Sequence, residues 1–363
     1  MPSLFDPIAI GSLSLKNRIW MAPLTRGRAT QEAVPTPIMV DYYTQRADAG
    51  LIITEATGIS REGLGWPYAP GLWNDNQVEG WKPVTEAVHA AGGRIVAQLW
   101  HMGRIVHPDL GGGQPVSASA TTAPDFAHTY EGKKPYVEAR PATLADIERI
   151  LRDYAHAARN AIRAGFDGVQ IHGANGYLID QFLRSSANHR EDEYGGSIDN
   201  RIRFAGEVIE AVAAEIGIER TGIRFSPNIE TQGVVDSDPL GLFTALAKRL
   251  EQLQVPWIEL REAHQPTSAG SIPTAPVSPE MRKHYSGVIA LNSDYVGDTG
   301  QARLDEGIGD AIAFGRAILA NPDLVARISA RAPLNEPDPA TFFTQGAEGY
   351  IDYPTLDEER AVA

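Results

Sequence analysis

Short apolar runs alternate with amphipathic stretches along nearly the whole chain, and this alternation constrains the fold more than any other feature. Each run is apolar through most of its length, as parallel strands are when both of their faces are buried. The stretches between them, such as 144–164, 201–216 and 240–253, place apolar residues at helical spacing. The eight predicted strands cover residues 19–24, 51–56, 94–100, 168–172, 222–226, 257–261, 288–292 and 311–315.

Eight strand–helix alternations predict an α/β fold, a closed (β/α)8 TIM barrel formed by residues 1–363 as one domain. An open doubly wound sheet is the main rival, but it usually carries a glycine-rich phosphate turn after its first strand. Here the first strand is followed by Thr25-Arg26-Gly27-Arg28, which lacks that pattern, so the barrel is favoured.

Two segments depart from the regular alternation. Residues 8–15 resemble a small hairpin that turns at Gly11-Ser12, and we expect it to plug the N-terminal end of the barrel. Residues 102–143, after the third strand, form a long connection rich in Gly, Pro, Ser and Thr. A connection of this length is usually functional or disordered, and on a barrel it would lie over the C-terminal face. We therefore predict a lid or an extra subdomain there.

The composition excludes several classes of function. A formal net charge of -14 argues against a nucleic-acid or anionic-membrane partner, which would require a basic face. The absence of cysteine excludes disulfides, thiolate catalysis and cysteine-ligated metal centres. His101 and His107 have no third ligand at a suitable spacing, so no metal site is predicted. No apolar run approaches the ~18 residues of a membrane helix and no signal peptide is visible, so we expect a cytoplasmic protein.

The densest group of candidate functional residues follows the fourth strand, at the barrel end where such enzymes place their active sites. His172 and Asn175 leave the strand among glycines and could offer two hydrogen-bond donors to a single oxygen. Such a pair would polarise a carbonyl or nitro group. Tyr177 is a candidate proton donor. The alternative is that His172 and Asn175 only hold the following loop in place.

Other strand ends contribute further polar and aromatic residues. Arg224 lies inside an apolar run, where it must meet either an anionic ligand or an internal Asp or Glu. Asn292 and Arg316 follow strands seven and eight, where barrels commonly bind phosphate. The full set at the strand ends is Thr25, Gln98, Trp100, His101, Arg224, Arg261, Asn292 and Arg316.

Four motifs together resemble the Old Yellow Enzyme family. They are the cluster from His172 to Tyr177, the run 188–201 with its Tyr194-Gly195-Gly196-Ser197, the Lys16-Asn17-Arg18 before strand one, and Gly349-Tyr350 with Tyr353-Pro354. The resemblance extends from about residue 4 to residue 356. It is strongest to bacterial ene-reductases of the N-ethylmaleimide and pentaerythritol tetranitrate reductase type.

The resemblance implies a bound FMN, reduced by NADPH or NADH, in a monomer or homodimer. Flavin N5 would pass hydride to an activated alkene, such as an enone, enal, maleimide or nitroalkene, and Tyr177 would protonate it. By matching position, His172, Asn175, Tyr177 and Thr25 would be catalytic, with Thr25 bonded to the flavin O4. Pro23, Leu24 and Ala56 would contact the isoalloxazine, Gln98 and Arg224 its pyrimidine edge, and Asn292, Gly315 and Arg316 the phosphate. The substrate pocket would add Trp66, Trp100, Tyr350 and Arg140, the last reaching in from the excursion.

Two alternatives remain open on the sequence. One is a flavin-independent barrel lyase or isomerase that uses His172 and Tyr177 as base and acid. The other is a flavoprotein whose main task is binding or electron relay. The lyase alternative explains the internal Arg224 and the predicted phosphate residue Arg316 least well.

Overall fold

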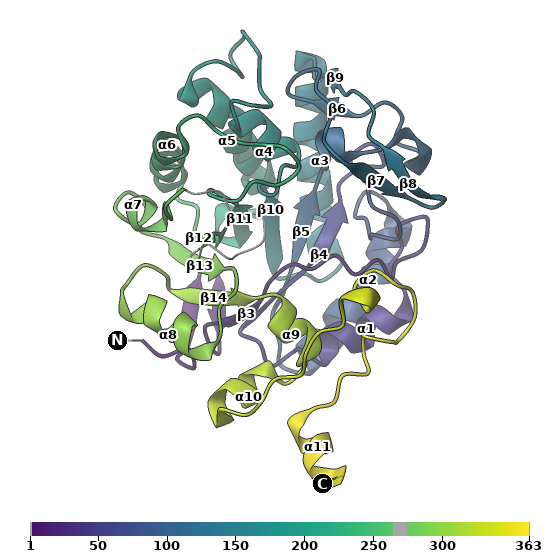
Figure 1. Cartoon of the computed structure of the whole chain (residues 1–363), viewed down its shortest axis with the longest axis vertical. Coiled ribbons are helices and arrows are strands. Elements are labelled where there is room, and N and C mark those ends of the chain that lie inside the picture. The colour runs from purple at the N-terminus through teal and green to yellow at the C-terminus, as the bar shows by residue number, and fades with distance from the viewer. Residues whose placement is uncertain (1, 264–273, 363) are drawn as a thin grey trace.

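Eight parallel strands close into a barrel at the centre of the protein, with helices around it (Figure 1). The computed structural model describes residues 2–263 and 274–362. The predicted TIM barrel is therefore confirmed. Its strands, in the order in which they pair, are β10 (Gly168–His172), β11 (Thr221–Phe225), β12 (Trp257–Arg261), β13 (Val288–Asn292), β14 (Ala311–Phe314), β3 (Ile19–Met21), β4 (Leu51–Gly58) and β5 (Ile95–Trp100).

The strand ends differ from the prediction by a few residues at most, for local reasons. Strands β10, β12 and β13 agree residue for residue with the sequence. Strand β3 stops at Met21, and Pro23 just beyond it has no N–H to donate to a ladder. Strand β4 is longer than predicted because its pairing with β5 continues as far as Gly58, after a register shift between Ile53 and Ala56.

Several of the longer helices begin at a residue whose side chain caps the first turn. Thr143 accepts the N–H of Asp146, Ser197 that of Asn200 and Asp238 that of Gly241. Because Ser197 is the cap, helix α5 starts three residues before the predicted 201. The helices are α1 (Pro37–Thr44), α2 (Asp75–Ala90), α3 (Leu144–Arg163), α4 (Leu178–Leu183), α5 (Ile198–Ile216), α6 (Pro239–Gln252), α7 (Ser278–Arg282), α8 (Gly297–Asp305), α9 (Arg316–Ala320), α10 (Leu324–Ala330) and α11 (Leu356–Val362).

The N-terminal end of the barrel interior is filled by apolar side chains. The predicted hairpin is present as β1 (Ile8–Ile10) and β2 (Leu13–Leu15), which pair antiparallel. Its Ile10 and Leu15 pack in one cluster with Trp20 and Trp257, whose rings meet edge to face at 5.5 Å. The hairpin therefore closes this end of the barrel, and the layered interior is solid.

The long excursion after β5 carries its own small strands and lies over the C-terminal face. It contains the parallel pair β6 (Val116–Ser117) and β9 (Arg140–Pro141), and the antiparallel pair β7 (Phe126–Thr129) and β8 (Gly132–Pro135). Its Met102, Ile105 and Val106 pack in one cluster with Ala56, near the end of β4, and Trp100, which ends β5. The excursion thus covers part of the C-terminal opening of the barrel.

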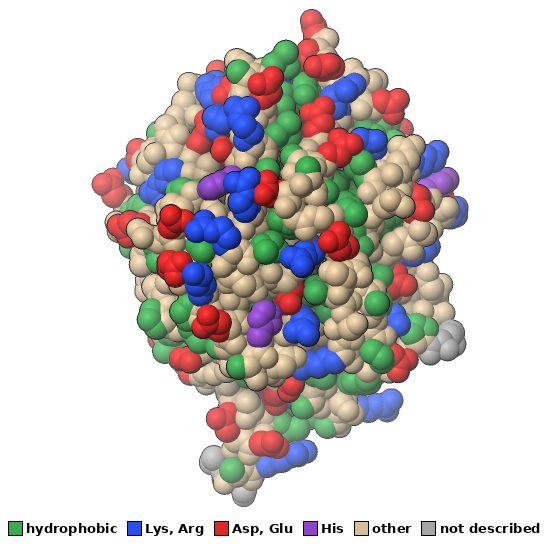
Figure 2. All heavy atoms as spheres, turned by 180° about the vertical axis from the view of Figure 1, so that it is seen from behind, with side chains coloured by type: hydrophobic (Ala, Val, Ile, Leu, Met, Phe, Trp, Pro, Cys, Tyr) green, Lys and Arg blue, Asp and Glu red, His purple; other side chains and the backbone are tan. Residues whose placement is uncertain are grey.

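Charged side chains of both signs share the surface. On the face shown in Figure 2, acidic and basic side chains are interspersed, so the excess acid is not gathered into one patch there. Within residues 2–263 and 274–362, no helix is long and apolar enough to cross a membrane.

Candidate active site

A cavity of about 500 Å³ opens where the carboxyl ends of the barrel strands meet. That volume lies within the ~300–1,000 Å³ common for ligand sites. The structure brings together at this cavity all but two of the residues to which the family resemblance assigns a role. They are Pro23, Leu24, Thr25, Ala56, Trp66, Gln98, Trp100, His172, Asn175, Tyr177, Arg224, Asn292, Gly315 and Arg316.

His172 ends β10 as a buried, neutral imidazole. Burial lowers its pKa well below the ordinary value, and the nearby charges of Arg224 and Arg261 lower it further. Its Nδ1 accepts the N–H of Ala174 at 3.3 Å. A neutral imidazole whose Nδ1 accepts must carry its proton on Nε2. His172 can therefore donate one hydrogen bond.

Asn175 is held in a single orientation by two hydrogen bonds and by its backbone conformation. Its backbone is in the left-handed region, with φ of 59°, and its N–H donates to Ser226 Oγ at 2.8 Å. Its Oδ1 accepts from Arg261 Nη1 at 2.7 Å. Because the carbonyl end of the amide is occupied, the NH2 end is left as the donor. His172 and Asn175 can thus each offer one hydrogen-bond donor at the cavity.

Arg261, at the end of β12, lies on the same side of the cavity as His172 and Asn175. No role was assigned to it from the sequence. Burial, followed by the charge of Arg224, lowers its pKa to about 10. It remains a cation at neutral pH, directly behind the amide of Asn175. In the sequence, only its position at a strand end, like that of Arg224, indicated that Arg261 could face the cavity.

Tyr177 stands in ring contact with the same wall. Its ring meets that of His172 edge to face at 4.9 Å and that of Trp100 at 5.0 Å. Burial raises its pKa, so the phenol keeps its proton at neutral pH. The loop before it is fixed because Gly176 donates to Asp180 Oδ2 and accepts from Gln181 Nε2.

Buried polar side chains form the floor of the cavity. The two partners considered for Arg224 were a ligand and an internal acid, and it has the acid: its Nε lies 3.0 Å from Glu259 Oε1. It also donates to Asn292 Oδ1 at 2.7 Å. Glu259 Oε2 accepts from Gln170 Nε2 at 2.8 Å, and Gln170 Oε1 accepts from Gln98 Nε2 at 2.7 Å. Gln170 and Glu259 are polar residues inside the otherwise apolar sequences of β10 and β12, and this could have marked them as candidates.

The predicted phosphate residues lie at one end of the cavity, but they are not all free. Arg316 donates to Asp294 Oδ1 at 2.7 Å and its side chain is largely exposed. Both ends of the Asn292 amide are engaged, by Arg224 and by the carbonyl of Ala313. Asn292 therefore orients Arg224. Of the three residues predicted to contact phosphate, Gly315 and Arg316 remain as candidates.

The donors and acceptors of the floor fit the pyrimidine edge of a flavin, which presents both carbonyl oxygens and an N–H. No hydrogen bond within the described residues uses Arg224 Nη1, which leaves a cationic donor. Gln98 has given its Nε2 to Gln170, which leaves its Oε1 as an acceptor. The residues present can therefore hold FMN.

Two residues predicted for the substrate pocket, Arg140 and Tyr350, do not line this cavity. Arg140 binds Asp146 Oδ2 at 2.6 Å and Glu62 Oε1 at 3.2 Å, which ties the excursion to α3. Tyr350 is fully buried and stacks on Tyr42 at 4.1 Å. In both cases the side chain is held by neighbouring residues outside the cavity.

The same C-terminal segment reaches the cavity through residues that carried no sequence signal. Arg26 and Arg28 donate to the carbonyl of Phe342 at 3.1 and 3.0 Å, which folds the segment over the barrel mouth. Phe343 then packs against Trp66 at 4.9 Å. Arg261 lines the cavity and was a strand-end candidate without an assigned role. The lining residues that were not candidates are Ala22, Arg26, Ile229, Ser293, Asp294, Leu319, Phe342 and Phe343.

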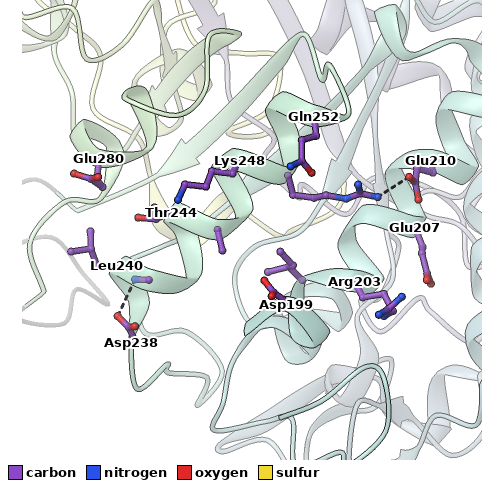
Figure 3. A pocket seen from close by; sticks show the side chains of 14 residues that line it. Asp199, Arg203, Glu207, Glu210, Asp238, Leu240, Thr244, Lys248, Gln252 and Glu280 are labelled. Atoms are coloured by element: carbon purple, nitrogen blue, oxygen red, sulfur yellow. Dashed lines mark hydrogen bonds and ion pairs between the residues drawn. The ribbon is translucent and has the colours of Figure 1, made fainter. Parts of the chain in front are cut away.

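A larger hollow of about 970 Å³ lies outside the barrel, between α5 and α6 (Figure 3). Several of its charged side chains have local partners: Arg249 pairs with Glu210 at 2.7 Å, and Asp238 caps α6. This hollow is an open groove between solvated helix faces. The candidate active site is the smaller cavity at the barrel mouth.

Comparison with known proteins places the chain in a family. Residues 3–335 match the family described as NADH:flavin oxidoreductase / NADH oxidase. The chain is 42% identical over 360 residues to a Leishmania infantum protein named "Probable flavin mononucleotide-dependent alkene reductase", covering 97% of each. It superposes on an old yellow enzyme homologue from Zymomonas mobilis with a TM-score of 0.96 and 57% identity, covering 98% of this chain and 100% of that one. Morphinone reductase in complex with tetrahydroNAD matches with a TM-score of 0.92 and 45% identity over 99% of both chains.

These matches cover nearly the whole chain at high identity, and they agree with a barrel mouth that can hold FMN. The flavin-independent lyase or isomerase is therefore set aside. The chain belongs to the NADH:flavin oxidoreductase / NADH oxidase family, among the old yellow enzymes, and is an FMN-dependent oxidoreductase.

Proposed function

We propose that the protein is an NAD(P)H-dependent ene-reductase that saturates the C=C bond of α,β-unsaturated carbonyl and nitro compounds. The observation that carries the proposal is the wall formed by His172, Asn175 and Tyr177, with two oriented donors beside a protonated phenol. The chemistry that FMN supplies when bound is hydride transfer, first from NADPH or NADH and then to the β-carbon of the alkene.

The two donors would bind the substrate oxygen. The Nε2–H of His172 and the NH2 of Asn175 would withdraw density from the conjugated alkene and stabilise the enolate or nitronate charge that develops. Donors of this kind are worth about 3–4 kcal/mol each in other enzymes. Both groups are held by the protein before substrate enters, so little reorganisation is needed.

Tyr177 would supply the proton to the α-carbon. Its pKa is raised by burial, so the phenol is protonated at neutral pH and available as a general acid. The overall balance is alkene plus NAD(P)H plus one proton, giving the saturated product and NAD(P)+. The phenolate is then reprotonated from water.

We propose enones, enals, maleimides and nitroalkenes as substrates, since each carries an oxygen conjugated to the alkene. Trp66, Trp100 and Phe343 give the cavity apolar aromatic surface on which the hydrocarbon part of such molecules would pack. NADPH and NADH are both retained as reductants.

A visible spectrum of the purified protein tests the proposal, followed by anaerobic addition of NADPH or NADH and then 2-cyclohexenone. Flavin absorbance should bleach with the nicotinamide and return with the enone, with cyclohexanone formed in equal amount. Bleaching that oxygen reverses but the enone does not would contradict alkene reduction and favour an electron-relay flavoprotein.

A further inference from the structure

Beneath the candidate FMN site, the acidic residue Glu259 is fully buried at the centre of a polar layer that crosses the barrel. It contacts Arg224 on one side and Gln170 on the other, and Gln170 leads to Gln98. We propose that Glu259 is a positioning residue of the FMN site, which sets the hydrogen-bonding direction of Gln98 and offsets the charge of Arg224. The proposal rests on FMN binding and is independent of alkene reduction.

The direction of the hydrogen-bond chain follows from the carboxylate. A carboxylate can only accept, so Gln170 must turn its NH2 toward Glu259 and its carbonyl toward Gln98. Gln98 must then donate its own NH2 to Gln170, which leaves its Oε1 as the group free to bind a ligand. A neutral amide in place of Glu259 could donate or accept, and the chain could then run either way. Glu259 therefore decides what Gln98 presents to the cavity.

The charge argument concerns the two arginines of the cavity. Arg224 and Arg261 both line it, and the carboxylate in contact with Arg224 among the described residues is Glu259. Both members of this pair are buried, so water screens their charges little. Reduction of FMN takes up two electrons and one proton and leaves one additional negative charge. Removing the charge of Glu259 would make the site more positive and would favour the reduced form.

Two substitutions at Glu259 separate charge from shape, because Gln keeps the shape and Asp keeps the charge. In the FMN-loaded protein, Glu259→Gln should raise the affinity for reduced over oxidised FMN at least about tenfold, a midpoint potential about 30 mV more positive. Glu259→Asp should stay within about threefold of the wild type. The proposal would be overturned if the midpoint potential shifted in Glu259→Asp but not in Glu259→Gln. It would also be overturned if neither variant shifted the potential.

A matched control is available on the same segment. Glu262 is also a buried carboxylate, but it is bonded to Val277 and Ser278 and does not line the cavity. Glu262→Gln should leave the midpoint potential unchanged. A rise equal to that of Glu259→Gln would mean that any lost carboxylate suffices, and would overturn the proposal.

A second variant covers the case in which Glu259→Gln does not fold. Gln170→Met cuts the chain to Gln98 and leaves the pair of Glu259 and Arg224 in place. The apoprotein should then bind FMN about tenfold more weakly, as followed by quenching of FMN fluorescence. Wild-type affinity would overturn the proposal. A wild-type protein that binds FMN but does not turn over enones would contradict the proposed function alone.

Discussion

The two ends of the barrel interior are equally buried but are built from opposite kinds of side chain. At the N-terminal end, Trp20 and Trp257 pack against the hairpin with no charge among them. At the C-terminal end, Arg224 and Glu259 are as deeply enclosed. Trp257 and Glu259 are two residues apart on β12 and so face the same side of the strand. Burial alone does not select the residue type.

The difference shows that the N-terminal end of the barrel contributes stability to the fold, whereas the polar C-terminal end contributes less. Apolar packing lowers the free energy of the folded state in proportion to the area removed from water. Buried charges are costly to desolvate, and well-packed apolar residues are often at least as stabilising. A polar layer is therefore retained at the C-terminal end for what it binds. Substitutions at the two ends should accordingly affect different measurements.

The largest expected effect is on chemistry at the C-terminal end. Tyr177→Phe should slow reoxidation of the reduced flavin by 2-cyclohexenone by about 10²- to 10⁴-fold, because the general acid is lost. Reduction by NADPH and the melting temperature should change little. Stopped-flow absorbance measures both half-reactions. An alkene half-reaction at wild-type speed would show that the proton comes from another group.

At the N-terminal end the large effect should be on stability. Trp257→Ala removes a buried ring and should lower the free energy of unfolding by on the order of 3–5 kcal/mol, measured by urea denaturation. Where the variant is folded, its flavin potential should stay near that of the wild type. Phe126→Ala, at a side chain 56% exposed, is the control and should change stability by less than about 0.5 kcal/mol. Equal losses for the two would contradict the apolar plug.

A smaller effect should connect Arg261 to Asn175. Each of Arg261→Met and Asn175→Ala should weaken binding of p-hydroxybenzaldehyde about tenfold, since a phenolate mimics the enolate oxygen. If Arg261 acts through the amide that it orients, the affinity loss of the double variant should be smaller than the product of the two single losses. The coupling free energy should be at least about 0.5 kcal/mol. Spectral titration of the bound flavin gives the affinities. Strict additivity would mean that Arg261 acts on the ligand directly.

The smallest expected effect is that of pH. His172 has a lowered pKa and stays neutral above it, while Tyr177 has a raised pKa and stays protonated below it. Between about pH 6 and 9 neither group changes charge, so the alkene half-reaction should vary less than about twofold. A titration step near pH 6.5 that disappears in His172→Ala would show that the imidazole is not neutral.

Much of the active site could be predicted because strand ends are legible in the sequence. Once strand β10 is located, His172 at its end must face the barrel mouth, and the same holds for Arg224 and Asn292 on their strands. Residues without a strand end to place them were less predictable. Arg140 and Tyr350 were expected in the cavity, but they found an ion pair and a stacked ring outside it.

The sequence by itself determined the closed barrel, the plugging hairpin and the cluster of donors after β10, because periodicity and strand-end position are local properties. Only the tertiary structure decided which donors are free. That Asn175 presents its NH2 and Gln98 its carbonyl depends on Arg261 and Glu259, which both lie on β12, far from Asn175 and Gln98 in the sequence. The position of Phe343 likewise depends on Arg26 and Arg28, more than 300 residues away. Hydrogen-bond direction is set by partners in space, and partners distant in the chain leave no periodic pattern.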